Sequence, residues 1–304
     1  IKGRAAILAN GNIVVDRDQE IAIENIIIAT GSSQRSLELL ATDGVSVITS
    51  KEIQALTQVP KSLLIIGGGS TGIEFAYMYS AYGSEVTVVE AQDQILPKED
   101  PEIAELLKKS LMGQGVSIYT NARIVAGGVK DGLVRCEIDV HNEETKTVIE
   151  AEKALISVGV SGNISGIGLE DLDIHTENGF IKIDEQMRTN APNIYAIGDV
   201  TGKLLLAHVA QAQGIIAAEV IAGFSHDELI YESIPRSTYC EPQISSFGYT
   251  EKQAVDNGYS IKIGRFPLTA NAKALAMGGE AGMGKVIVNK ENNNILGAHI
   301  IGPE

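Results

Sequence analysis

A glycine-rich turn between an apolar strand and a helix constrains this chain more than any other feature. The run from Ser62 to Ile66 is apolar and leads into GGGSTGIE, where Gly67, Gly69 and Gly72 have the spacing G-x-G-x-x-G. In this context the first glycine permits a tight turn, the second lets the backbone approach a pyrophosphate, and the third allows helix and strand to pack closely. The amides and dipole at the helix start favour phosphate. The segment therefore predicts a dinucleotide-binding βαβ unit.

An acidic residue follows the second strand of this unit. That strand is Val86 to Val89, and Glu90 stands directly after it, where a carboxylate accepts hydrogen bonds from the adenosine ribose. Glu90 would repel a 2′-phosphate, and no Arg or Lys occurs between Glu90 and Lys98 to attract one. The pattern favours NAD over NADP. The alternative is that the three glycines only pack a βαβ corner.

The spacing of apolar residues along the whole chain predicts an α/β fold. Short apolar runs alternate with helical stretches, which argues against all-α and all-β architectures. Beyond Ile230 the pattern changes to short strands and indicates a separate α+β domain. The further helices expected are 101–112 and 207–223, and the further strands expected are 26–28, 116–119, 132–140, 154–158, 194–197, 245–249, 261–266 and 285–288.

The charge balance argues against two classes of partner. The chain has 24 Lys+Arg against 39 Asp+Glu, a net charge of −15, and no basic cluster, so it lacks the electrostatic footprint of a nucleic-acid or anionic-membrane binder. No apolar stretch is long enough for a membrane helix, and the first residues lack the layout of a signal peptide. We expect an intracellular protein whose partners are small molecules or proteins. The chain begins at Ile1 and stops at Glu304, after an apolar run, so we expect a piece of a longer protein.

The cysteines and histidines predict neither a disulfide framework nor a metal site. Cys136 and Cys240 stand far apart in the sequence, which fits neither a disulfide scaffold nor a short-spaced redox or metal pair and indicates a reducing compartment. We expect both to be structural thiols, and Cys136 falls on the apolar face of a strand. Metal-ligand spacing is missing among the five histidines, which are His141, His175, His208, His226 and His299.

A second nucleotide signature lies in the segment TNAPNIYAIGDV. It places Asp199 at the end of an apolar strand and shortly before a helix that begins near Ala207. An aspartate there can bind sugar or ribityl hydroxyls, while the amides of the helix start can stabilise negative charge on a ring system. The other interpretation, that Asp199 only caps a turn, stays open on the residues alone.

Taken together, these motifs resemble a known family. They are IIIATGS, GGGSTGIE with VTVVE, TNAPNIYAIGDV, LLAH, FPLTANAKALAMGG and ILGAHIIGPE. Their unbroken order along essentially the whole chain is similar to that of the flavin- and NAD-dependent pyridine nucleotide–disulfide oxidoreductases, most closely to the branch that oxidises dihydrolipoamide. The resemblance implies a Rossmann-type NAD domain inserted in an FAD-binding domain, plus an α+β dimerisation domain. The implied parts are 1–52 (the C-terminal part of the FAD-binding domain), 53–162 (NAD-binding), 163–230 (a central, FAD-contacting domain) and 231–304 (partial dimerisation domain).

The resemblance also implies two cofactors, FAD and NAD, and the residues that contact them. Those implied near FAD are Gly31, Ser50, Lys51, Glu52, Asp199, Leu205, Leu206, Ala207 and His208. Those implied near NAD are Gly67, Gly68, Gly69, Ser70, Thr71, Gly72, Ile73, Glu74, Glu90, Ile124 and Gly159. For His208 the amide is the implied contact, and it stays open whether its imidazole is merely packed or exposed. Two departures from the family pattern are VGVSGN in place of VGRxPN, and Lys203-Leu204 before LLAH.

The activity implied is oxidation of dihydrolipoyl groups, with electrons passing through a redox disulfide and FAD to NAD. The implied partners are a lipoyl-bearing acyltransferase of a 2-oxo acid dehydrogenase complex and a second copy of the chain, in a bacterial cytoplasm or a mitochondrial matrix. The family's redox cysteines belong before Ile1 and its His-Glu pair after Glu304, so we expect no catalytic residue in this chain and no turnover by it.

Two alternatives remain open. One is a sister FAD/NAD(P) oxidoreductase, such as an NADH peroxidase, a mercuric or glutathione reductase, or a transhydrogenase. The other is a non-catalytic NAD-binding module, because the NAD part looks complete whereas the FAD part lacks its first glycine-rich motif.

Overall fold

The computed structural model describes residues 1–277 and 282–303, which form two compact units. The larger unit consists of residues 34–159 and 232–304, and the smaller unit of residues 1–33 and 160–231. Each combines helices with strands, which confirms the predicted α/β class. Gly278 and Gly279, at the end of the TANAKALAMGG motif, and Glu304, the last residue of ILGAHIIGPE, lie outside the described residues. The division into four parts stays a prediction.

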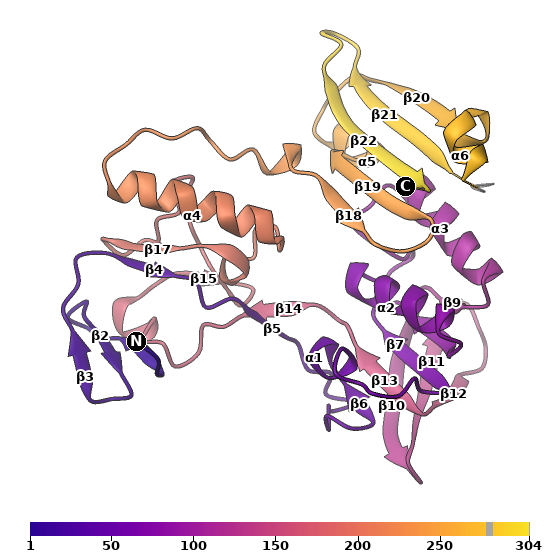
Figure 1. Cartoon of the computed structure of the whole chain (residues 1–304), viewed down its shortest axis with the longest axis horizontal. Coiled ribbons are helices and arrows are strands. Elements are labelled where there is room, and N and C mark those ends of the chain that lie inside the picture. The colour runs from indigo at the N-terminus through magenta and orange to yellow at the C-terminus, as the bar shows by residue number, and fades with distance from the viewer. Residues whose placement is uncertain (278–281, 304) are drawn as a thin grey trace. The chain divides into compact units, whose positions relative to one another are not determined.

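A parallel sheet in the order β6-β13-β7-β8-β9 forms the centre of the larger unit (Figure 1). The βαβ unit predicted around the glycine turn is present: β7 leads into α2, which returns to β8. Helix α3 then connects β8 to β9, and it begins with an Asp N-cap and a proline in its first turn, both of which favour helix initiation. The elements are β6 (Val47–Ile48), α1 (Ser50–Ile53), β7 (Ser62–Ile66), α2 (Ser70–Ala81), β8 (Glu85–Val89), α3 (Pro101–Gly113), β9 (Ser117–Tyr119) and β13 (Lys153–Ile156).

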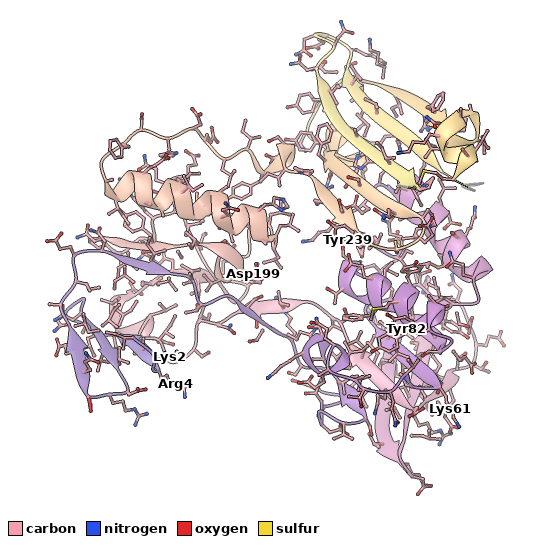
Figure 2. The ribbon with its side chains drawn as sticks, viewed as in Figure 1. Lys2, Arg4, Lys61, Tyr82, Asp199 and Tyr239 are labelled. Carbon is pink, nitrogen blue, oxygen red and sulfur yellow. The ribbon has the colours of Figure 1, made fainter. Side chains whose placement is uncertain are left out.

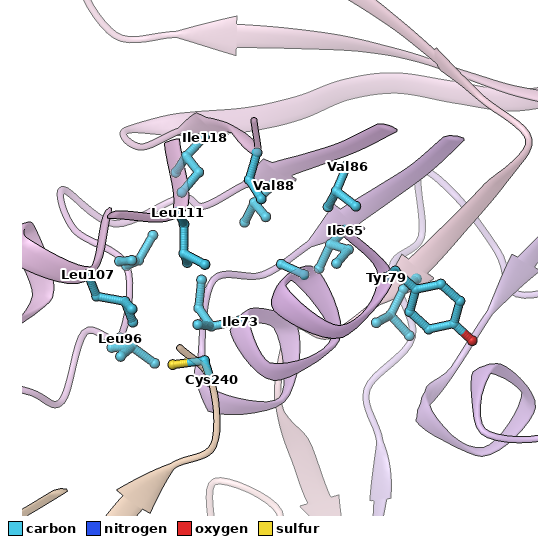
Figure 3. Close-up of a cluster of buried hydrophobic side chains, with 14 of the residues drawn as sticks. Ile65, Ile73, Tyr79, Val86, Val88, Leu96, Leu107, Leu111, Ile118 and Cys240 are labelled. Atoms are coloured by element: carbon cyan, nitrogen blue, oxygen red, sulfur yellow. The ribbon is translucent and has the colours of Figure 1, made fainter. Parts of the chain in front are cut away.

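Both faces of this sheet are buried, as expected for parallel strands. Alternate side chains of β7 enter two different clusters: Leu63 and Ile65 point to one face, and Leu64 and Ile66 to the other. Helices α2 and α3 cover the first face (Figure 3). Their contributions to that cluster include Ile73, Ala76, Tyr79, Ile103, Leu107 and Leu111.

An antiparallel sheet covers the second face of the parallel sheet. Along 132–140 the predicted alternation is confirmed, because Val134, Cys136 and Ile138 are fully buried and Arg135 is exposed. Its first strand was not expected, since the run ARIVAGGVK mixes polar residues with two glycines and contains an irregular register. The strands are β10 (Ala122–Lys130), β11 (Leu133–Val140) and β12 (Thr147–Ala151).

The rest of the larger unit is a five-stranded antiparallel sheet in the order β18-β19-β22-β21-β20, called here the C-terminal sheet. It shares a core with α2 and α3, because Cys240, Ile244 and Ile301 belong to the same cluster as Ile73, and Figure 3 shows Cys240 near Ile73. The elements are β18 (Arg236–Thr238), β19 (Gln243–Gly248), α5 (Glu251–Asp256), β20 (Ile261–Pro267), α6 (Ala272–Ala276), β21 (Met283–Asn289) and β22 (Ile295–Gly302).

The smaller unit contains short strands and one long helix, α4 (Ala207–Ile221). The predicted strands at 26–28 and 194–197 pair in parallel as β4 (Ile26–Ile28) and β17 (Ile194–Ala196). Within the described residues, no helix has both the length and the apolar character needed to cross a membrane. The other strands and short 3₁₀ helices are β1 (Ala5–Ile7), β2 (Ile13–Val15), β3 (Gln19–Ile21), β14 (Val160–Gly162), η1 (Glu170–Leu172), β15 (Thr176–Glu177), β16 (Phe180–Ile181) and η2 (Gly198–Thr201); β5 (Ser32–Gln34) pairs with β14.

Two apolar residues of α3 test how this helix packs. Leu107 is fully buried in the first cluster, so Leu107→Ala should lower the free energy of unfolding by about 2 to 5 kcal/mol. Met112 on the same helix is 50% exposed, so Met112→Ala should change it by no more than about 0.5 kcal/mol. Urea unfolding of the two variants measures both values, and equal losses would contradict the packing of α3 described here.

Candidate functional site

The glycine turn is closed by contacts that only glycine allows. Gly67 has a φ of +108°, and a Cβ on it would lie 2.1 Å from the carbonyl oxygen of Ser157. A Cβ on Gly72 would lie 2.0 Å from the carbonyl oxygen of Gly67 and 3.2 Å from Cγ2 of Ile65. The roles predicted for the first and third glycines are thereby visible: one permits the turn and the other lets α2 approach β7.

The middle glycine faces open space instead. Gly69 is the N-cap of α2, its backbone is extended, and no side chain caps the helix there. A Cβ on Gly69 would meet no atom within 4 Å. The first amides of a helix have no partner inside the helix, and its dipole favours negative charge at that end. This geometry suits a pyrophosphate placed against the start of α2.

Glu90 holds the turn from the adjacent strand end. Its carboxylate accepts the amide of Gly68 at 2.6 Å through Oε2 and the amide of Gln92 at 2.7 Å through Oε1, and the residue is 7% exposed. The sequence predicted only a ribose contact for this side chain. Each carboxylate oxygen accepts about two hydrogen bonds, so Glu90 has capacity left for ribose hydroxyls.

Three strand ends bring the predicted NAD residues to one edge of the parallel sheet. The amide of Gly67 donates to the carbonyl of Val89 at 2.9 Å, and the amide of Ser157 donates to the carbonyl of Ile66 at 2.7 Å. Gly159 follows β13 with a φ of +95°. Ligands of open parallel sheets bind outside the carboxyl ends of the strands, so this edge is a candidate nucleotide site.

Other members of the predicted NAD set pack in the hydrophobic clusters or hold the backbone of another segment. Ile73 is fully buried in the first cluster and Ile124 is 9% exposed in the second. Glu74 is half-buried and accepts the backbone amide of Tyr239 at 3.0 Å. Burial raises the pKa of Glu74, and that hydrogen bond opposes the rise only in part. Ser70 and Thr71 lie in the first turn of α2.

In the smaller unit, Gly31 and Asp199 follow the carboxyl ends of the paired strands β4 and β17. Gly31 follows β4 with a φ of +72°, and Asp199 lies in η2, directly after β17 (Figure 2). The hydroxyl of Ser32 donates to Oδ2 of Asp199 at 3.0 Å. Asp199 is half-buried, so its other oxygen can accept a ligand hydroxyl.

The start of α4 provides further amides in this unit. Leu206 is its N-cap in an extended conformation and has no side-chain cap. Ala207 and His208 are exposed in the first turn, and Leu205 before them is 37% exposed. The imidazole of His208 is therefore exposed rather than packed. The geometry allows the amides of this turn to face an electron-rich ring, which is the role that the resemblance implied.

Ser50, Lys51 and Glu52 belong to α1 in the larger unit, so the predicted FAD set is divided between the two units. Thr49 and Glu52 form a capping box: the amide of Thr49 donates to Oε2 of Glu52 at 2.9 Å. Hydrogen bonds from the hydroxyl and amide of Thr49 lower the pKa of Glu52. The side chain of Glu52 thus caps a helix in this structure rather than pointing at a ligand.

One functional residue was missed by the sequence interpretation. Gln213 in α4 is fully buried, accepts the amide of Gly198 at 2.6 Å and donates to the hydroxyl of Tyr231 at 2.9 Å. It therefore fixes the turn that carries Asp199. The available signal was a glutamine on the apolar face of a helix and outside every motif, which is too weak to assign a role.

The two cysteines are buried and not joined to each other. Burial raises the pKa of Cys136 to about 11. Burial, together with the nearby carboxylates of Glu74 and Glu241, raises the pKa of Cys240 to about 12. Both thiols are protonated at neutral pH, which agrees with the structural role expected for them. Among the described residues, no group of three or more acidic, histidine or cysteine side chains is arranged to hold a metal ion.

Comparisons with known proteins match most of the chain. A family model described as pyridine nucleotide-disulphide oxidoreductase matches residues 2–214, and one described as the dimerisation domain of that family matches residues 234–304. A dihydrolipoyl dehydrogenase of Chlorobaculum tepidum is 42% identical over 282 residues, which cover 93% of this chain and 60% of the relative. One of Bacillus subtilis is 42% identical over 280 residues, covering 92% and 59%.

Solved structures also match nearly all of this chain. LpdA of Mycobacterium tuberculosis has a TM-score of 0.86 at 29% identity and is matched over 98% of this chain and 63% of its own. The HOCl-induced flavoprotein disulfide reductase RclA of Escherichia coli has a TM-score of 0.88 at 29% identity, over 100% of this chain and 69% of its own. The chain spans 59 to 60% of the length of the two dihydrolipoyl dehydrogenases above.

Two alanine substitutions separate the roles of the glycines. Gly72→Ala places a methyl group 2.0 Å from a backbone oxygen, so it should lower the free energy of unfolding by about 1 to 3 kcal/mol or more. Gly69→Ala meets open space at an ordinary φ of −72°, so it only replaces glycine by a poorer N-cap and should lower it by no more than about 1 kcal/mol. Urea midpoints compare the two, and equal stability of the variants would contradict the turn geometry.

The raised thiol pKa values predict slow reaction with a thiol reagent. At pH 8 both cysteines of the folded chain should react far more slowly than free cysteine, because each is buried and protonated. In urea both should react at the rate of an exposed thiol. Absorbance of the released chromophore counts the reacted thiols, and a fast-reacting cysteine in the folded chain would show that one of them is accessible.

Proposed function

The chain belongs to the pyridine nucleotide-disulphide oxidoreductases, and we propose that the whole protein is a dihydrolipoyl dehydrogenase that passes electrons from dihydrolipoyl groups through FAD to NAD. The observation that carries the proposal is the glycine turn, which is open at Gly69 and carries the Glu90 carboxylate behind it. Relatives with that name at 42% identity support the choice of substrate.

The residues of this chain account for dinucleotide binding. The start of α2 faces the position of a pyrophosphate, and Gly69 leaves the room for it. Glu90 is already oriented by the amides of Gly68 and Gln92, so little ordering is needed when it accepts ribose hydroxyls. A 2′-phosphate at this place would meet a buried carboxylate, which favours NAD over NADP.

FAD fits the residues of the smaller unit. Asp199 and the amides of Leu206 to His208 would hold it, with Asp199 on hydroxyls and the amides toward the ring. When bound, FAD supplies the electron transfer between a dithiol and the nicotinamide. Cys136 and Cys240 cannot serve as the dithiol of this chain because both are buried and protonated. We expect no turnover by the 304-residue chain and weak retention of FAD.

The partners and the compartment proposed for the whole protein are based on the family match and on its relatives. The match to a dimerisation domain supports a homodimer. A lipoyl-bearing acyltransferase of a 2-oxo acid dehydrogenase complex is the partner that a dihydrolipoyl dehydrogenase requires for its substrate. The relatives described above are bacterial, which supports the cytoplasm of a bacterium rather than a mitochondrial matrix.

A second candidate function is a disulfide reductase of another substrate. The likeness to RclA, with a TM-score of 0.88 at the same 29% identity as LpdA, favours keeping it. Reduction of lipoamide by the whole protein with NADH distinguishes the two, because a reductase with another substrate would leave lipoamide unreduced. The third possibility, a nucleotide-binding module without catalysis, is what we expect of the chain by itself.

Titration calorimetry of the chain with NADH and NADPH tests the nucleotide assignment, with free FAD added in a parallel run. NADH should bind more tightly than NADPH. Glu90→Gln should weaken NADH binding roughly 10- to 150-fold, because hydrogen bonds to a charged acceptor contribute about 1.5 to 3 kcal/mol.

Glu85→Gln is the matched control, since Glu85 is an exposed glutamate at the opposite end of the same strand. It should leave NADH binding unchanged. A folded Glu90→Gln variant that binds NADH like the unmodified chain would remove Glu90 from the site. A circular dichroism melt of each sample separates loss of binding from loss of fold.

A further inference from the structure

A row of five polar residues crosses one face of the C-terminal sheet, with one residue on each strand. Arg236 pairs with Ser246, Ser246 with His299, His299 with Lys285, and Lys285 with Arg265. Directly paired residues of antiparallel strands point to the same face of a sheet. The five side chains therefore form a line perpendicular to the strands, called here the polar row.

The polar row faces acidic residues around the start of α3. Nε of Arg236 is 3.2 Å from Oε1 of Glu99, and the hydroxyl of Ser246 donates to Oε2 of Glu99 at 2.6 Å. Nδ1 of His299 lies 4.0 Å from the same Oε2, while Nε2 of His299 is 2.9 Å from the carbonyl oxygen of Tyr249. Three neighbouring strands thus converge on the single carboxylate of Glu99.

Lys285 is the centre of the second half of the polar row. Its ammonium contacts the carboxylates of Asp100 at 2.9 Å, Glu102 at 3.0 Å and Glu251 at 2.9 Å. Lys285 is 1% exposed and Asp100 is 0% exposed. Burial alone would lower the pKa of Lys285, but its hydrogen bonds to Glu251, Asp100 and Glu102 outweigh burial and raise it.

Removing one partner from this group leaves buried charges uncompensated, which lowers the free energy of unfolding. Asp100 also caps α3, since its side chain accepts the amide of Glu102 at 3.1 Å. Arg265 completes the row with a hydrogen bond from Nε to Oε2 of Glu102 at 2.8 Å. That pair lowers the pKa of Glu102 to about 2, with Lys285 adding to the effect. The position of residues 99–102 is thus fixed by the C-terminal sheet.

The other end of this acidic stretch holds the glycine turn. Residues 90–100, called here the linking segment, run from Glu90 to Asp100. The carboxylate of Glu90 accepts the amide of Gly68 at 2.6 Å, and the amide of Leu96 donates to the carbonyl of Gly68 at 2.7 Å. The linking segment therefore makes hydrogen bonds with both the backbone amide and the backbone carbonyl of Gly68.

Internal bonds make the linking segment stiff. The amide of Glu99 donates to the carbonyl of Leu96 at 2.9 Å, and the side-chain amide of Gln94 donates to the carbonyl of Glu99 at 3.1 Å. Ile95 and Leu96 are buried in the cluster that contains Ile73 of α2. Hydrogen bonds thus connect Glu99 to Leu96 and Leu96 to Gly68.

We propose that the polar row, through the linking segment, holds the glycine turn in its dinucleotide-binding geometry, so that Lys285 is a positioning residue for the nucleotide. The proposal rests on the proposed function in taking the turn as the NAD site. It gives the C-terminal sheet a role within one chain, in setting the affinity of the nucleotide site in the same unit.

The test compares two lysine-to-methionine variants of the 304-residue chain. Lys285→Met should raise the dissociation constant for NADH at least about fivefold, the lower end of coupling between linked sites. It should also speed hydrogen exchange of the Leu96 amide by a similar factor. The reference is the amide of Ile138 in β11, which reports on opening of the antiparallel β10-β11-β12 sheet. Lys285→Arg, which keeps the charge, should recover at least part of both effects.

Lys252→Met is the matched control. Lys252 lines the same cavity of about 330 Å³ as Lys285, but it is exposed and pairs only with Asp256 among the ion pairs of the described residues. It should change neither NADH affinity nor exchange at Leu96. An equal effect of both variants would overturn the proposal, and so would a folded Lys285→Met variant with unmodified affinity and exchange.

The test still decides the proposal if NADH does not bind or if Lys285→Met does not fold. If the unmodified chain does not bind NADH, the proposed function fails, and exchange at Leu96 alone decides whether the polar row controls the turn. If Lys285→Met does not fold, Ser246→Ala replaces it, because this variant removes only the hydroxyl that donates to Glu99. Ser246→Ala should speed exchange at Leu96 at least about twofold relative to Ile138, and an unchanged rate would overturn the proposal.

Discussion

Three backbone segments of the larger unit come so close together that no side chain fits between them. The carbonyl of Ser157 after β13, the turn at Gly67 and the first turn of α2 at Gly72 are stacked in sequence, with only hydrogen atoms between them. This approach fixes where α2 begins relative to β7 and β13, and the two cores of the parallel sheet form around it. The same approach leaves the start of α2 pointing at the carboxyl edge of the sheet, where Gly69 faces open space.

The candidate site therefore consists of a backbone turn and of one charged side chain that is bonded to it. Glu90 adds a carboxylate that is already oriented by two amides before any ligand arrives. The helix start favours phosphate and the carboxylate favours hydroxyl groups over a second phosphate, so we propose that the two features together favour NAD over NADP. In the smaller unit the arrangement repeats in simpler form, with Asp199 and the start of α4 taking the parts of carboxylate and amides.

Most of the fold could be predicted because its signals are local. The glycine turn, the helices at 101–112 and 207–223 and the alternating strand at 132–140 each depend on residues within one segment, and the structure has all of them within a few residues of the expected ends. Strand β10 was missed because its glycines and its irregular register hide the alternation. The structure has the close backbone approaches expected at Gly67 and Gly72, whereas their contact with a nucleotide stays a prediction. The prediction gave Glu52 and Glu90 no structural part, since their backbone partners depend on tertiary geometry.

The polar row could not be predicted, because it assembles one residue from each of five strands and no segment contains two of them. In the sequence alone Lys285 is an ordinary polar residue of a short strand, whereas in the structure it is buried among three carboxylates. The most direct test of the account is a two-dimensional amide spectrum of the chain titrated with NADH. We predict that the largest shifts fall on residues 67–72 and 90, with smaller ones along the linking segment. Shifts confined to the smaller unit, or none at millimolar NADH, would contradict the account.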